Sequence, residues 1–92
     1  MKCIELVIKG KVQGVFFRKH TKDKARQHGV KGFVQNKDDG SVYIIACGED
    51  ESIENFSKWC HQGPDAAKVV SIEKQDIPVE MHNEFVIKKD RN

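Results

Sequence analysis

Long apolar runs, proline and aromatic residues are all scarce in this chain. Only two of the 92 residues are proline and 8% are aromatic, and no proline-rich linker or low-complexity segment is present. No apolar run approaches the ~20 residues of a membrane-spanning helix, so we expect no membrane span. The first residues alternate like a β-strand, so we expect no signal peptide and a cytoplasmic location. The composition, 38% hydrophobic and 33% charged, predicts one globular domain over residues 1–92.

Cysteine and histidine are too scattered to indicate a metal site. Cys3, Cys47 and Cys60 have none of the spacings of metal ligands. The four histidines pair with no cysteine or carboxylate at a ligand interval. We therefore expect neither a metal nor a cofactor.

The net charge of +2 conceals an uneven distribution. Residues 9–37 carry nine Lys or Arg and one acid, whereas residues 38–92 carry six bases and twelve acids. Such a field would steer a small anion to the positive end of the molecule. The simpler interpretation is that most of these lysines and arginines form a solvated helix face.

Hydrophobic periodicity predicts alternating strands and helices. Strands are expected at Cys3–Lys9, Lys31–Asn36, Ser41–Cys47, Lys68–Asp76 and Glu84–Lys88. One helix is expected at Phe17–His28, and a second begins with Asp50 or Ser52 as its cap and ends before Gly63. Only Lys89–Asn92 have the character of a tail.

The order β-α-β-β-α-β plus a short strand predicts an α+β fold, the ferredoxin-like α/β sandwich. Its antiparallel sheet carries two helices on one face, and the first two strands run parallel with the third between them. Cys3 then lies beside Cys47, where a disulfide is geometrically possible. In a reducing cytoplasm we expect two packed thiols instead. Phe56, Trp59 and Cys60 are expected in the core.

A glycine-bearing loop, GKVQGVFFR at residues 10–18, joins the first strand to the first helix. Backbone N–H groups at a helix start have no partner within the helix, and the helix dipole adds positive character, so this loop can hold an anion. The planar guanidinium of Arg18 can bind two oxygens of that anion together. The alternative is an ordinary strand-to-helix connection, since the loop lacks the Gly-Lys-Ser/Thr of a Walker A motif.

The predicted topology brings Asn36 towards the same loop. The C-terminal ends of the first two strands lie on one edge of the sheet, about 10 Å apart at ~4.8 Å per strand step. Asn36 closes the second strand, and the loop follows the first. A phosphate and a water therefore fit between Arg18 and Asn36.

These residues resemble the two signatures of the acylphosphatase family. The loop at residues 10–18 is similar to the first, and GFVQN at 32–36, followed by DGSV at 39–42, resembles the second. The resemblance covers almost the whole chain. It implies a small cytosolic enzyme, without a metal, that hydrolyses acyl phosphates to a carboxylate and phosphate. It assigns phosphate binding to Arg18 and water orientation to Asn36.

The substrate phosphate is expected on the backbone amides of Val12, Gln13, Gly14, Val15, Phe16, Phe17 and Arg18. One departure from the family pattern concerns Lys37, which follows Asn36 where a hydroxyl residue is frequent. We expect a monomer that acts on a small acyl phosphate.

Two rival functions use the same fold. RNA-recognition domains share the element order, and KGFV at residues 31–34 echoes part of their aromatic motif. That motif belongs on the third strand, and here Gln35 replaces the next aromatic residue, so we expect no nucleic-acid partner. A non-catalytic anion-binding or docking module would bind phosphate without hydrolysing an acyl phosphate.

Overall fold

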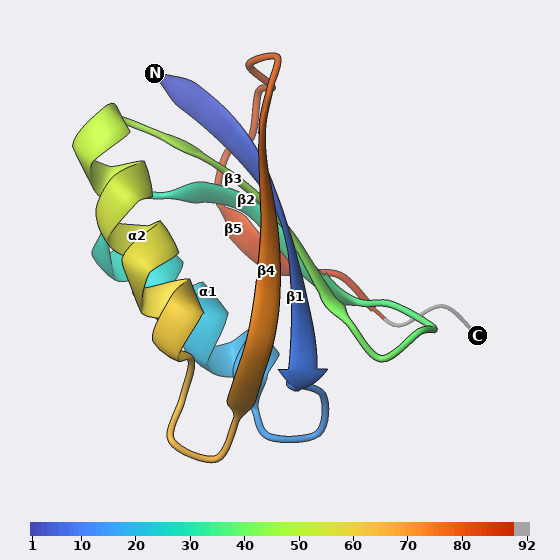
Figure 1. The fold of residues 1–92 in the computed structure, drawn as a ribbon. Coiled ribbons are helices and arrows are strands. Elements are labelled where there is room, and N and C mark those ends of the chain that lie inside the picture. Colours follow the sequence, from blue (N-terminus) through green and yellow to red (C-terminus); the bar gives the residue numbers. More distant parts are fainter. Residues whose placement is uncertain (90–92) are drawn as a thin grey trace.

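The structure is a computed structural model that describes residues 1–89 (Figure 1). Its elements are β1 (Lys2–Lys11), α1 (Phe17–Gln27), β2 (Lys31–Asn36), β3 (Val42–Gly48), α2 (Asp50–Gln62), β4 (Lys68–Ile77) and β5 (Phe85–Ile87). Every predicted element is present, with ends that agree to within two residues. The predicted tail lies outside the described residues except for Lys89. Within residues 1–89, no helix is long and apolar enough to cross a membrane.

The five strands form one sheet in the order β4-β1-β3-β2-β5. β3 pairs antiparallel with β1 on one side and with β2 on the other, so β1 and β2 run parallel as predicted. Both helices cover the same face of the sheet (Figure 1). The ferredoxin-like prediction is therefore confirmed. The short strand β5 adds to the edge of β2 in parallel, which makes the sheet mixed.

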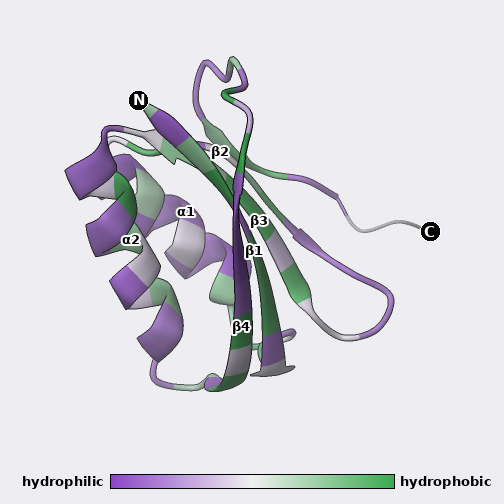
Figure 2. Cartoon of the chain, turned by 45° about the horizontal axis from the view of Figure 1, so that its top comes forward, coloured by the Kyte–Doolittle hydropathy of each residue, from purple (hydrophilic) through white to green (hydrophobic). Residues whose placement is uncertain are grey.

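The main hydrophobic core lies between the sheet and the two helices. Alternate residues of β1, Ile4, Leu6 and Ile8, are fully buried there because successive side chains of a strand point to opposite faces. The helices contribute buried Phe17 and Phe56 and keep polar residues on their outer surfaces (Figure 2). This packing fixes the start of α1 against the sheet.

A second, smaller cluster lies on the opposite face of the sheet. Cys3, Ile45 and Cys47 are buried in it. The connection from β4 to β5, residues 78–84, crosses this face, because the two strands form opposite edges of the sheet. Within it the Glu80 N–H group donates to Cys3 Sγ at 3.3 Å, and the His82 ring lies 6.2 Å from the Phe33 ring. The sheet is thus covered on both sides at this end.

Cys3 and Cys47 are joined by a disulfide, so the expectation of two packed thiols is wrong. The two residues are direct partners in the β1–β3 register, with Cα atoms 4.1 Å apart. Side chains opposite each other in neighbouring antiparallel strands come within reach of a disulfide. Cys60, in contrast, is a free and buried cysteine, as predicted for the core.

The start of α2 differs from the predicted cap. Glu49 precedes the helix with an extended backbone, and Asp50 is already the first helical residue, so a cap at Asp50 or Ser52 is wrong. The helix begins with a bond from the Ile53 N–H group to the Glu49 carbonyl at 2.9 Å. Asp50 and Glu51 lie in the first turn, where the helix dipole favours negative charge.

Reduction of the disulfide is expected to destabilise the fold. The bridge joins residues 44 apart, and cross-linking a loop of this length removes enough entropy from the unfolded chain to contribute about 2–4 kcal/mol. Urea unfolding of the wild type with and without dithiothreitol measures this difference. The Cys47→Ala variant is the control, since its stability should be low and insensitive to reductant. An unchanged wild-type midpoint on reduction would contradict the expectation.

Candidate functional site

The loop after β1 has an unusual backbone. Gly14 and Phe16 both have positive φ, 76° and 59°, and Phe16 is a bulky residue for which the left-handed conformation is uncommon. Left-handed residues in a loop can turn successive backbone N–H groups towards one concavity. The Phe16 side chain is 75% exposed, so core packing does not explain its conformation. Strained backbone of this kind clusters at active sites and ligand-binding loops.

The loop leads directly into the first turn of α1, which is open to an anion. Phe16 is the N-cap residue, and within residues 1–89 no side chain caps this end. The first turn, Phe17 to His20, contains no acid. Arg18 lies half-buried in this turn. The N–H groups of the turn and the dipole of α1 therefore favour a negatively charged ligand.

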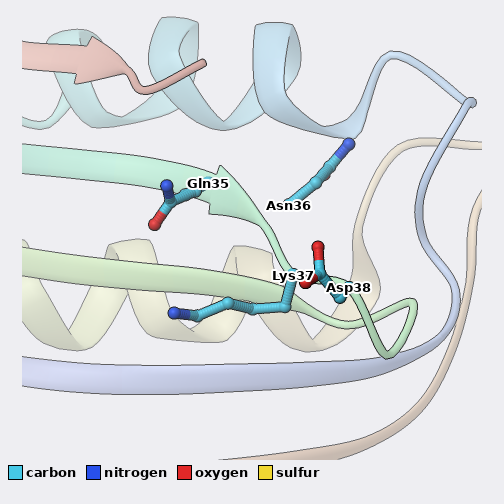
Figure 3. A pocket seen from close by; sticks show the side chains of 4 residues that line it. All are labelled: Gln35, Asn36, Lys37 and Asp38. Atoms are coloured by element: carbon cyan, nitrogen blue, oxygen red, sulfur yellow. The ribbon is translucent and has the colours of Figure 1, made fainter. Parts of the chain in front are cut away.

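Asn36, the last residue of β2, points from the sheet towards the entry to α1 (Figure 3). It lies on the same face as buried Val34, whereas Gln35 points to the other side (Figure 3). The Oδ1 atom of Asn36 is buried and has no hydrogen-bond partner among residues 1–89. A buried acceptor without a donor costs about 1–3 kcal/mol, so the Asn36 side chain is held here at an energetic cost. The amide nitrogen is the end of the side chain that points towards the entry to α1 (Figure 3).

The structure thus directs Asn36 towards the helical turn that carries Arg18, as the topology predicted. An open pocket of about 310 Å³ at the end of β2 is lined by Gln35, Asn36, Lys37 and Asp38 (Figure 3). Lys37 turns away from Asn36, with its Nζ atom 4.5 Å from the centre of the Tyr43 ring. The Lys37 side chain therefore does not hold the Asn36 side chain in place as a hydroxyl residue could.

The side chain of Gln13 joins the loop to the turn between β2 and β3. Its Nε2 atom donates to the carbonyl oxygens of Lys37 and Ser41, both at 2.8 Å. From the sequence we expected only the backbone amide of Gln13 to take part in the site, so this contact was missed. The sequence did contain a signal for this contact, because a long amide side chain in a glycine-bearing loop can hydrogen-bond to a neighbouring turn.

Asp39 organises the turn that Gln13 contacts. Its Oδ1 atom accepts from the Ser41 backbone N–H at 2.9 Å and from the Ser41 hydroxyl at 2.6 Å, which is an Asx turn. The Ser41 hydroxyl and N–H lower the pKa of Asp39, because both bonds favour the ionised carboxylate. The turn is also closed by a backbone bond from Lys37 N–H to Ser41 O at 2.9 Å.

Comparison with known proteins gives consistent matches over most of the chain. The family model described as Acylphosphatase matches residues 4–87. An acylphosphatase of Marinobacter nauticus is 44% identical over 73 residues, 79% of each chain. One of Coxiella burnetii is 38% identical over 86 residues, 94% of this chain and 90% of the relative.

Solved structures agree with these sequence matches. The structure of an acylphosphatase from Coxiella burnetii superposes with a TM-score of 0.91 at 38% identity, covering 95% of this chain and 92% of that one. The crystal structure of acylphosphatase from Bacillus subtilis gives 0.93 at 31% identity, covering 96% and 99%.

Replacing Asp39 is expected to destabilise the protein in a pH-dependent way. A carboxylate whose pKa is lowered by folding contributes stability above its unfolded pKa of about 3.9, and this contribution is lost as the pH falls through the lower folded pKa. Asp39→Ala should therefore be less stable than wild type at pH 7, and the difference should shrink at about pH 2.5. Urea unfolding at both pH values tests this. Asp38→Ala, in the same turn, is the matched control and should show a smaller pH-dependent difference.

Proposed function

The chain belongs to the acylphosphatase family, and on this basis we propose that it hydrolyses acyl phosphates to a carboxylate and inorganic phosphate. The substrate is a small acyl phosphate, and the reaction uses no metal or cofactor. We also propose that the protein acts as a cytoplasmic monomer, which size-exclusion chromatography would test.

The position of the Asn36 side chain is the observation that most supports this proposal. The side chain lies at the end of β2, and its amide nitrogen is the end directed to the first turn of α1 (Figure 3). A water that accepts from the Asn36 amide N–H with one lone pair would keep its other lone pair for attack. Asn36 would in this way hold the nucleophile beside the phosphoryl group.

The phosphoryl group would be held by the loop and by Arg18. Backbone amides between Val12 and Arg18 bind its oxygens, and the guanidinium bridges two of them. The positive φ of Gly14 and Phe16 and the uncapped start of α1 support this role. These donors are fixed before the substrate arrives, so they stabilise the charge of the transition state without reorganisation.

Acyl phosphates suit a site of this composition. Their leaving group is a carboxylate with a pKa of ~4, which departs without a proton, so no general acid is needed. Transfer through a loose transition state depends mainly on positioning and charge stabilisation. An amide cannot act as a base, so the proton of the attacking water passes to a phosphoryl oxygen or to solvent. An alkyl phosphate would release an alkoxide, and the proposed site assigns no side chain to protonate it.

Loss of either side chain should abolish most of the activity. We expect Arg18→Gln and Asn36→Ala to lower kcat on benzoyl phosphate by roughly 10²–10³, the usual effect of removing one preorganised donor. Arg18→Lys should also fail, because a point charge cannot bridge two oxygens. Spectrophotometry of benzoyl phosphate hydrolysis provides the measurement.

The control for charge is Lys19→Gln, which removes an exposed cation from the next position of α1 and should stay near wild type. Rapid turnover of a simple alkyl phosphate, with Arg18→Gln still active, would contradict the mechanism. Phosphate binding without hydrolysis of benzoyl phosphate would instead identify a non-catalytic anion-binding module.

A further inference from the structure

We propose that the Gln13 side chain is a positioning residue, which holds the backbone next to Asn36 so that the attacking water is in line with the phosphoryl group. This inference rests on the proposed function and adds to it. The sequence-based expectation gave Gln13 a role through its backbone amide alone. The side chain contributes a separate contact, on the other half of the site.

The contact connects the two segments that the reaction must align. Gln13 belongs to the loop that would hold phosphate, and its Nε2 atom reaches the carbonyl oxygens of Lys37 and Ser41 at 2.8 Å each. The Lys37 carbonyl is one residue beyond Asn36. On the preceding side, Asn36 is held by its register with Val42 of β3. The backbone around Asn36 is thus fixed by the sheet before it and by Gln13 after it.

Alignment of this kind has a large effect on rate. The attacking oxygen, the phosphorus and the leaving oxygen must lie close to one line, and a displacement of ~1 Å can cost about 10²-fold. The phosphoryl group would be fixed by the loop and the water by Asn36. A hydrogen-bonded link between loop and turn sets their relative position.

A primary amide suits this position. Nε2 of glutamine carries two N–H donors, which match the two carbonyl acceptors. A glutamate of the same shape would present only acceptors to both carbonyls. A methionine would fill similar space with no donor at all.

The turn does not depend on Gln13 for its own closure. Ser41 O also accepts from Lys37 N–H at 2.9 Å, and Lys37 O from Gly40 N–H at 3.1 Å. Asp39 adds its two bonds to Ser41. Without the Gln13 side chain, the turn therefore keeps its fold, and its position relative to the loop is set by the sheet alone.

The experiment compares Gln13→Met and Gln13→Glu with wild type on benzoyl phosphate. Both variants retain the backbone amide and Arg18, so we expect KM and the inhibition constant of inorganic phosphate to change by less than about threefold. In contrast, kcat should fall about 10- to 100-fold, since alignment and not phosphate binding is lost. Gln13→Lys restores a donor and should give a higher kcat than Gln13→Met.

Gln75→Met is the matched control. Gln75 is an exposed residue of β4, the edge strand that pairs with β1 on the side away from β3. Its kcat should stay near the wild-type value. Thermal unfolding of all variants separates a loss of fold from a loss of alignment.

The possible results distinguish this inference from the function on which it rests. If wild type hydrolyses no acyl phosphate, the proposed function fails, and the inference fails with it. If wild type is active and Gln13→Met has an unchanged kcat, the inference alone is wrong. It is equally wrong if phosphate affinity falls while kcat is kept, because Gln13 would then serve phosphate binding.

Discussion

The pairing of β3 with β1 on one side and β2 on the other is the constraint on which the proposed site depends. It makes β1 and β2 parallel and brings their C-terminal ends to one edge of the sheet. The loop before α1 and the residue Asn36 are therefore neighbours, although they lie far apart in the sequence. Buried residues of β1 and β3 pack against the two helices and stabilise this arrangement.

Fixed backbone groups dominate the chemistry that this edge can perform. Within residues 1–89 no side chain caps the start of α1, and the loop takes a left-handed conformation at Phe16 that the exposed side chain does not explain. Asn36 contributes a buried acceptor that the described protein atoms leave unsatisfied. A helix start without a side-chain cap and an amide side chain directed towards it lie together at this edge of the sheet, which favours the binding of an anion there.

Much of this architecture could be predicted from the sequence because strand alternation, helix periodicity and turn residues are local signals. Lys31–Asn36 was predicted with the bounds that the structure gives, and the topology then directed Asn36 to the loop. The Gln13 contact was not predictable in the same way, because it depends on where two turns lie in space. The disulfide was missed for another reason. The topology predicted that Cys3 and Cys47 are adjacent, as their register shows. We expected free thiols because we assumed a reducing cytoplasm.

The sheet face away from the helices has its own polar and apolar chemistry. The Tyr43 hydroxyl donates to Glu5 Oε2 at 2.6 Å, and burial together with this bond raises the pKa of Tyr43 to about 12.

The disulfide on the same face is buried. Cys3 and Cys47 are only 1% and 3% exposed, and the Glu80 N–H group donates to Cys3 Sγ. A thiol in solution can attack this bond only after the sulfurs become exposed, and movement of residues 78–84 away from the sheet would expose Cys3 Sγ. The speed of thiol exchange at this bridge would therefore record how often the segment between β4 and β5 detaches while the rest of the molecule stays folded.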